Sequence, residues 1–168
     1  PDLASALVER AGSAGKEREE ELKKAARALK IKKLVMAQTY AASCAKDSKI
    51  AVPHPEGLEY LPYQRAAIAF GLDHPNGLLA DEMGLGKTIE AIGLINADES
   101  AQRVLIVCPA SLKLNWQREC ETWLVDRGPV GVAGKKFPED CKIVIINYDI
   151  LRKWKKHLRG KWDVLIAD

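Results

Sequence analysis

The sequence predicts an α/β domain with a parallel sheet flanked by helices, preceded by an N-terminal helical segment. Its longest apolar runs, residues 104–108 and 143–146, do not alternate with polar residues, which is typical of strands covered on both faces. Amphipathic stretches separate these runs, and strands that alternate with helices indicate parallel pairing with right-handed crossovers. A glycine-rich segment at 81–88 lies between an apolar run and an amphipathic stretch.

Residues 1–48 form the first expected unit, a helical segment rich in Ala, Glu, Lys and Arg. From Lys16 onward the pattern is helical, and Gly12 and Gly15 predict a break before it. One face of this helix carries Leu22, Ala26, Leu29, Met36 and Tyr40. The stretch 23–33 is basic, and we read it as a solvated helix face in preference to a DNA contact.

The second expected unit spans residues 49–168, because Pro53, Pro55 and Gly57 end any preceding helix. Apolar runs predict its strands, and amphipathic stretches between them predict its helices. Pro109 ends one strand, and Ser111 is placed to cap the helix that follows. In chain order we expect a strand at 77–80, a helix at 87–97, a strand at 104–108, a helix at 111–124, a strand at 142–147, a helix at 150–159 and a strand at 164–167.

Composition restricts the function classes only broadly. The chain has 168 residues, 47% of them hydrophobic, which suits one domain with a helical extension. A net charge of +3 does not by itself indicate a nucleic-acid partner. The opening residues lack the apolar core of a signal peptide and no apolar run could span a bilayer, so we expect a soluble intracellular protein with no membrane partner. Four scattered cysteines predict reduced packing residues, not a disulfide frame or a zinc site: Cys44, Cys108, Cys120 and Cys141.

The segment 81–88 (DEMGLGKT) has the features of a phosphate-binding loop. Gly84 and Gly86 let the backbone curl and point its N–H groups at phosphate oxygens, and the following helix adds the positive end of its dipole. Lys87 would reach the β- and γ-phosphates, and the Thr88 hydroxyl would ligate Mg²⁺. Asp81 stands where the common pattern has glycine. The competing interpretation is a turn followed by a solvated first helical turn.

With its flanks, segment 81–91 (DEMGLGKTIEA) resembles the first motif of the Swi/Snf-related ATPases, the DNA translocases of helicase superfamily two. That family commonly has Asp at the position of Asp81. The resemblance covers about residues 53–168 and implies a partial RecA-like P-loop domain that is truncated at the acidic motif. It implies the ATP-binding portion of a DNA-dependent ATPase, which couples ATP hydrolysis to movement on double-stranded DNA. The implied cofactors are ATP and Mg²⁺.

The resemblance also implies roles for individual residues. Segment 61–64 (LPYQ) is similar to the adenine-recognition motif, in which Gln64 would read the adenine edge; alone, it would only start an amphipathic helix. Met83 and Leu85 would bind the nucleotide with the rest of the loop, and Lys87 would be catalytic. Segment 162–168 (WDVLIAD) is similar to the strand before the acidic motif, so Asp168 would be catalytic and would hold Mg²⁺ opposite Thr88.

Two further segments, 104–112 (VLIVCPASL) and 143–149 (IVIINYD), resemble strands that lead into loops facing the DNA backbone. The implied contacts are Pro109 and Ser111 in the first and Asn147 and Tyr148 in the second, without base recognition. Packing of Tyr148 at the strand end is an equal alternative. Trp116 and Trp123 are better read as a core stripe than as base-stacking residues. The most basic patch could be a solvated or a DNA-facing surface: Arg152, Lys153, Lys155, Lys156, Arg159 and Lys161.

In the family, a glutamate that activates water follows the position of Asp168, and a second lobe supplies an arginine finger. We therefore expect the 168-residue chain alone to be a very poor ATPase. A strand that usually lies between the phosphate-loop strand and the acidic-motif strand is also missing, which predicts a gap or an unpaired sheet edge.

Two other function classes compete with this interpretation. The first is a truncated, catalytically inactive nucleotide- or DNA-binding module. The second is an unrelated P-loop kinase or GTPase, which segments 61–64 and 109–112 disfavour. The run of Pro53 and Pro55 favours the annealing-helicase-like bacterial or phage branch of the family. That branch implies a cytoplasmic, nucleoid-associated location; in a eukaryote the location would be nuclear. The sequence indicates no oligomeric state.

Overall fold

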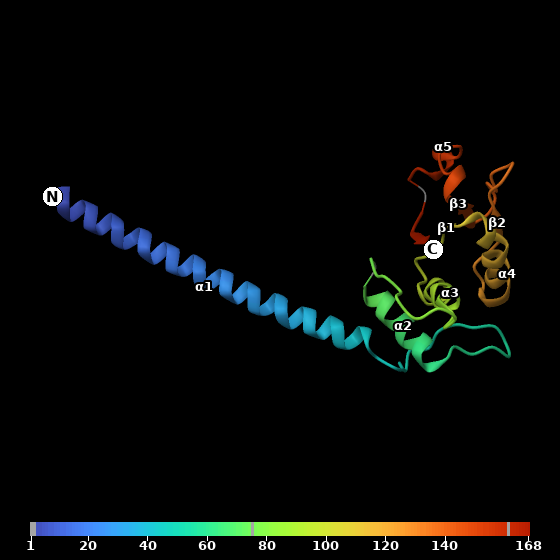
Figure 1. The fold of residues 1–168 in the computed structure, drawn as a ribbon, viewed down its shortest axis with the longest axis horizontal. Helices are drawn as coiled ribbons and strands as arrows, with labels where there is room; N and C mark the ends of the chain where they lie inside the picture. Colours follow the sequence, from blue (N-terminus) through green and yellow to red (C-terminus); the bar gives the residue numbers. More distant parts are fainter. Residues whose placement is uncertain (1–2, 75, 161) are drawn as a thin grey trace. The chain divides into compact units, whose positions relative to one another are not determined.

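The computed structural model describes residues 3–74, 76–160 and 162–168, with the backbone alone for 3–17 and for Glu19. It divides into two compact units that meet in the sequence between Cys44 and Ala45. The first unit consists largely of one helix, and the second contains the sheet and the remaining helices (Figure 1). The two units are described separately.

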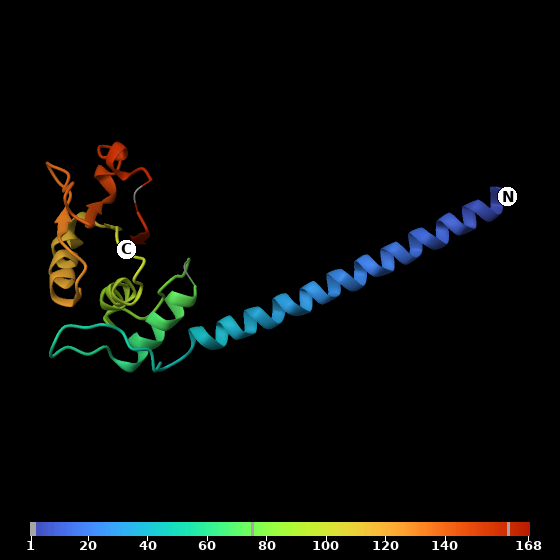
Figure 2. The ribbon, with the colours of Figure 1, turned by 180° about the vertical axis from the view of Figure 1, so that it is seen from behind.

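The first unit is built on helix α1, Leu3–Ser43, which runs without interruption (Figure 2). The predicted helix beyond Lys16 is confirmed, but the predicted break at Gly12 and Gly15 is wrong. A glycine costs a helix only about 1 kcal/mol relative to alanine, and the surrounding Ala, Glu and Lys are strong helix formers. The apolar stripe is exposed, with Leu22 and Tyr40 at 65% and 72%. Neither α1 nor any other described helix combines the length and the apolar character needed to cross a membrane.

The second unit contains a parallel four-stranded sheet. Its strands are β1 (Val104–Cys108), β2 (Val130–Val132), β3 (Ile143–Asn147) and β4 (Val164–Ala167), in the order β2-β3-β1-β4. β1 lies between β3 and β4, with Val104 opposite both Ile143 and Val164. The carboxyl ends of β1, β3 and β4 therefore meet at one edge of the sheet, where ligands bind in open α/β folds.

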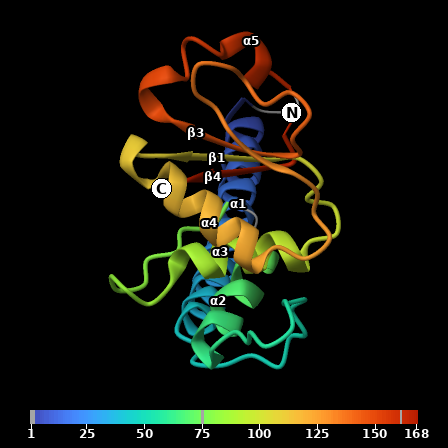
Figure 3. The same ribbon diagram turned by 90° about the vertical axis from the view of Figure 1, so that its right-hand side faces the viewer.

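Helices cover both faces of this sheet. Figure 3 shows α2 (Pro62–Asp73), α3 (Lys87–Ala97) and α4 (Lys113–Trp123) on one side of the strands and α5 (Lys155–Leu158) on the other. Every residue of β1 and β3 is buried, because side chains on one face pack against α2–α4 and those on the other pack near α5. The predicted α/β fold with a parallel sheet flanked by helices is confirmed.

The predicted strand at 77–80 is wrong. This segment carries no strand in the structure, and Leu78 is 83% exposed. A strand is stable only when its backbone groups pair with a neighbour. Among the described residues, β4 pairs with β1 alone and forms an edge of the sheet, and segment 77–80 is not hydrogen-bonded to it or to any other strand. The expected unpaired edge is therefore found at β4, where Leu165 is 65% exposed.

Three other elements differ in detail from the prediction. The helix expected at 111–124 begins as a short 3₁₀ turn, η1 (Ala110–Leu112), and continues as α4. Ser111 lies inside that turn and caps neither helix, so the predicted cap is wrong. The helix expected at 150–159 is reduced to η2 (Tyr148–Ile150), a turn and α5, because the backbone at Trp154 leaves helical geometry. β2 was not predicted.

All four cysteines are free thiols, as the sequence predicts. Cys108 and Cys120 are buried in the core between the sheet and its helices. Burial raises the pKa of both thiols, that of Cys120 to about 12 with a further contribution from Glu119 and Glu121. Both thiols therefore stay protonated at neutral pH and act as small apolar packing groups.

Candidate nucleotide-binding site

The glycine-rich loop has the backbone conformation that its sequence requires. Gly84 and Gly86 have φ angles of +87° and +88°, in the left-handed region that L side chains rarely adopt. A Cβ atom on Gly86 would also lie 2.7 Å from Nε2 of Gln64. Helix α3 begins at the next residue, Lys87, so its free N–H groups face the loop. This backbone can surround an anion at the start of α3.

The Lys87 side chain folds back over the loop. Its ammonium group donates hydrogen bonds to the backbone oxygens of Asp81 at 2.8 Å and Glu82 at 2.9 Å. These carbonyl oxygens satisfy the cation where phosphate oxygens would otherwise accept its hydrogen bonds. A nucleotide would exchange two neutral acceptors for charged ones, which form stronger hydrogen bonds with an ammonium group.

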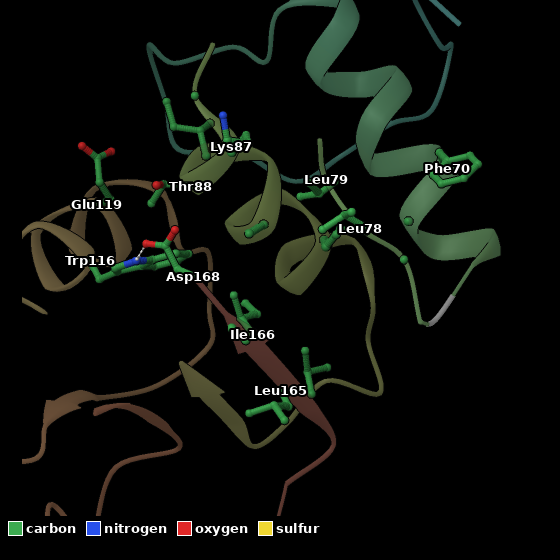
Figure 4. A pocket seen from close by; sticks show the side chains of 18 of the residues that line it. Phe70, Leu78, Leu79, Lys87, Thr88, Trp116, Glu119, Leu165, Ile166 and Asp168 are labelled. Atoms are coloured by element: carbon green, nitrogen blue, oxygen red, sulfur yellow. Dashed lines mark hydrogen bonds between the residues drawn. The ribbon is translucent and has the colours of Figure 1, made fainter. Parts of the chain in front are cut away.

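The loop opens onto a cavity of about 530 Å³ that also reaches the end of β4. The loop contributes Gly84, Gly86, Lys87 and Thr88, and Asp168, which follows β4, lines the same cavity (Figure 4). Residues far apart in the sequence are brought together because β4 lies beside β1 in the sheet. The cavity continues between segment 77–79 and β4, where its lining is apolar.

Asp168 is held at three points. Its backbone N–H donates to the Val107 oxygen at 2.9 Å, and its backbone oxygen accepts from the Tyr148 hydroxyl at 2.8 Å. Its carboxylate accepts a hydrogen bond from the indole Nε1 of Trp116 through Oδ2, also at 2.8 Å. Figure 4 shows this bond beside the Thr88 side chain. The position of Asp168 is therefore fixed by β1, η2 and α4 together.

The residues present fit a nucleotide with its magnesium ion. The Thr88 hydroxyl and the Asp168 carboxylate are hard oxygen donors of the kind that Mg²⁺ prefers, and they line one cavity. Lys87 in the same cavity is the cation that a β- or γ-phosphate needs. When bound, Mg²⁺ would neutralise charge on the phosphate oxygens, while Lys87 and the loop backbone would orient the phosphates.

Gln64 is placed against the loop and not in the cavity. Its side chain is 3% exposed, Nε2 donates to the Leu85 oxygen at 3.1 Å, and Oε1 accepts from the Leu61 N–H at 3.0 Å. The Tyr63 hydroxyl donates to the same Leu85 oxygen at 2.9 Å. Both residues thus connect the start of α2 to the glycine-rich loop. Recognition of adenine by Gln64 stays a prediction, and it requires the amide to exchange one of these partners.

The other residues predicted to bind nucleotide or DNA do not line this cavity. Met83 is 97% exposed, and Leu85 contacts its neighbours through its backbone oxygen. Pro109 and Ser111 are exposed on the loop after β1. Asn147 is buried and donates to Asp149, whereas Tyr148 is about half exposed and bonds to Asp168. Their DNA contacts stay predictions, and Asn147 has little surface with which to make one.

Sequence reasoning assigned no place in the cavity to three residues of α4 that line it, Asn115, Trp116 and Glu119. Trp116 is buried in the core, as its helical spacing predicts, but its N–H points at Asp168 (Figure 4). The spacing of apolar residues identifies a buried face and carries no information on where an indole N–H is directed. Glu119 lies one helical turn further along α4, so it reaches the same cavity.

Glu90 is a buried carboxyl group beneath the loop. It is fully buried in α3, and neither of its oxygens accepts a hydrogen bond from a described residue. Burial raises the pKa of Glu90 to about 7, the negative charge of Asp81 and a hydrogen bond to it add to the shift, and Lys87 opposes it. Near neutral pH a large fraction of this carboxyl group is therefore protonated.

This shift predicts how the stability of the chain depends on pH. Because the folded pKa of Glu90 lies above the ordinary value of 4.5 for a glutamate, its protonated form favours folding, and this contribution is complete below about pH 4.5. It is lost as the pH rises to about 7. Glu90→Gln keeps the shape without the titration, so its free energy of unfolding should fall less than that of the wild type across this range. Denaturant unfolding at several pH values measures the difference.

The exposed Glu99→Gln variant is the matched control and should follow the wild type at every pH. If Glu90→Gln and Glu99→Gln have the same pH dependence, Glu90 does not titrate in this range in the folded chain.

Comparison with protein families gives one match that covers most of the chain. The model of the SNF2-related domain matches residues 16–168. A structure described as the Sulfolobus solfataricus SWI2/SNF2 ATPase core in complex with dsDNA is similar in fold, with a TM-score of 0.58 and 23% identity. The similarity covers 71% of this chain and 28% of that one.

Individual relatives are similar over shorter stretches. A bovine SWI/SNF-related matrix-associated actin-dependent regulator of chromatin subfamily A-like protein 1 is 36% identical over 113 residues, which are 64% of this chain and 12% of the relative. The human DNA annealing helicase and endonuclease ZRANB3 is 37% identical over 99 residues, 54% of this chain and 9% of the relative. A probable global transactivator of Orgyia pseudotsugata multicapsid polyhedrosis virus is 33% identical over 145 residues, 80% of this chain and 29% of that protein. The chain thus spans less than a third of each.

Proposed function

Because the chain belongs to the SNF2-related domain family, we propose that it is the ATP-binding part of a DNA-dependent ATPase that moves along double-stranded DNA. The cavity that joins Lys87 and Thr88 to Asp168 is the observation that carries the proposal. The partial RecA-like lobe, residues 49–168, would hold ATP and Mg²⁺ there. The protein would act where its DNA lies, in the nucleus of a eukaryote or on a bacterial nucleoid.

Each residue of the site would have a distinct role in binding ATP. The backbone around Gly84 and Gly86 would surround the phosphates, and Lys87 would move from its two loop carbonyls to the β- and γ-phosphates. Thr88 and Asp168, which line the same cavity, would hold Mg²⁺ together. Since phosphoryl transfer depends on charge stabilisation from several directions, we expect little turnover from this chain alone.

Contacts to DNA would come from the same edge of the sheet. Pro109 and Ser111 are exposed on the loop that follows β1, and Tyr148 lies at the end of β3. The basic patch has exposed cations at Arg152, Lys155, Lys156 and Arg159, whereas Lys161 lies outside the described residues. Such groups suit contact with phosphates and carry no sequence information.

Binding of labelled duplexes to the 168-residue chain tests the DNA part of the proposal. Two duplexes of equal length and unrelated sequence should bind with similar affinity, and log K should fall steeply and linearly with log salt, because phosphate contacts release counterions. Fluorescence anisotropy at several salt concentrations measures both properties. A strong preference for one duplex, or affinity that is insensitive to salt, would refute backbone binding.

Competition between ATP and GTP tests the predicted role of Gln64. The wild-type chain should prefer ATP, and Gln64→Ala should lose that preference. Equal affinity of the wild type for both nucleotides would rule out adenine recognition, while the phosphate site could still be detected through its binding of either nucleotide.

A further inference from the structure

Trp116 is buried on α4, at the turn that faces the end of β4. Its side chain is 3% exposed, and its indole Nε1 donates to Oδ2 of Asp168 at 2.8 Å. An indole has one donor, and a buried donor without a partner costs about 1–3 kcal/mol, so this bond restricts both residues. The Asp168 side chain itself is exposed to the cavity, where it would otherwise be free to rotate.

The hydrogen bond distinguishes the two oxygens of the Asp168 carboxylate. Oδ2 is occupied by Trp116, and among the described residues no side chain or backbone N–H donates to Oδ1. The backbone of Asp168 is fixed independently, by Val107 and Tyr148. Once the backbone and one oxygen are held, the direction of the other oxygen is set.

We propose that Trp116 is a positioning residue for the metal ion of this site: its N–H orients the Asp168 carboxylate so that Oδ1 is presented to Mg²⁺ or to a water of its hydration shell. The inference rests on the proposed function, because it concerns the metal ion that accompanies ATP. Partners that hold a ligating carboxylate in place typically contribute 10- to 100-fold, roughly, to metal affinity. Packing alone would give Trp116 a role in stability and none in the dependence of nucleotide binding on Mg²⁺.

Trp116→Phe removes the N–H donor and keeps an aromatic ring in the core. Trp123→Phe is the matched control, because Trp123 is buried on the same helix and packs against Tyr60, away from the cavity. Binding of a non-hydrolysable ATP analogue is measured for each chain with excess Mg²⁺ and with EDTA. The ratio of the two dissociation constants gives the contribution of the metal ion.

The wild type and Trp123→Phe should show the same ratio of dissociation constants. In Trp116→Phe this ratio should be smaller by on the order of 10-fold, while the affinity of the variant for the analogue in EDTA should equal that of the wild type. An equal ratio in all three chains would overturn the inference while leaving the nucleotide site intact. If the wild type binds no nucleotide in either condition, the proposed function fails and the inference fails with it.

A second measurement on the wild type applies even if Trp116→Phe does not fold. The chain has four tryptophans, so its indole N–H resonances are few and can be assigned by single substitutions. Titration of Mg²⁺ into the chain with the ATP analogue should shift the Trp116 indole resonance well beyond that of Trp123. If the Trp116 resonance stays unchanged while the nucleotide binds with Mg²⁺, the inference is overturned.

Discussion

Replacing Lys87 with alanine should weaken the binding of Mg²⁺-ATP by roughly 10- to 150-fold, since a hydrogen bond to a charged group contributes about 1.5–3 kcal/mol. The Lys87 ammonium group lines the cavity and already bridges the loop through Asp81 and Glu82. No other described lysine or arginine lines this cavity, so none is placed to take over its contact with the phosphates. Isothermal titration calorimetry on the wild type and the variant measures the change.

The control is Lys136→Ala, which removes an exposed lysine from the connection between β2 and β3. It changes the net charge equally and should bind Mg²⁺-ATP as the wild type does. Thermal unfolding of Lys87→Ala shows whether the loop survives without its two hydrogen bonds. A folded Lys87→Ala chain with the affinity of the wild type would contradict the assignment of Lys87 to the phosphates.

Asn96→Ala should lower the free energy of unfolding by about 2–4 kcal/mol, because it leaves several buried polar groups without partners. Asn96 is 3% exposed at the end of α3, and its Nδ2 donates to the Trp123 oxygen at 2.7 Å and to the Tyr60 hydroxyl at 3.1 Å. Its Oδ1 accepts from the Val125 N–H at 3.1 Å, and Nδ2 also lies 3.2 Å from the Pro53 oxygen. One amide thus connects α3, the end of α4 and the segment before α2.

Denaturant unfolding of the second unit measures this loss. Asn115→Ala makes the same chemical change at an exposed position on α4 and should alter the free energy of unfolding by less than about 0.5 kcal/mol. If Asn96→Ala is no more destabilising than Asn115→Ala, the connection through Asn96 does not stabilise the fold.

The sequence predicts three strands correctly: β1 and β3, which are buried on both faces, and the edge strand β4, whose residues alternate in exposure. β1 and β3 are uninterrupted apolar runs in the centre of the sheet, so local composition and tertiary position agree. Segment 77–80 has a similar composition, but its pairing depends on a neighbour that the described residues do not supply. β2 has only three residues, with Gly131 at its centre, and it forms a strand because its backbone pairs with β3. Pairing is a tertiary property that composition does not encode.

The site likewise has features that local sequence predicts and features that depend on tertiary packing. The conformation of Gly84 and Gly86 and the start of α3 at Lys87 follow from local chemistry, and the sequence predicts them. The meeting of Thr88 and Asp168 was predicted through the family resemblance, since no local pattern connects positions so far apart. The hydrogen bonds of Gln64 and Trp116 were not predictable, because they depend on where α2 and α4 pack against the loop and β4.

The central claim is that the loop at 81–88 and Asp168 form one Mg²⁺-nucleotide site. Amide chemical-shift mapping of the ¹⁵N-labelled chain, with a non-hydrolysable ATP analogue and Mg²⁺, tests it most directly. If the loop and Asp168 do form one site, the largest shifts should occur at the amides of Gly84, Gly86, Lys87 and Thr88, and Asp168 should show a shift that requires Mg²⁺. Saturating nucleotide that leaves these amides unchanged, or that shifts a different surface instead, would contradict it.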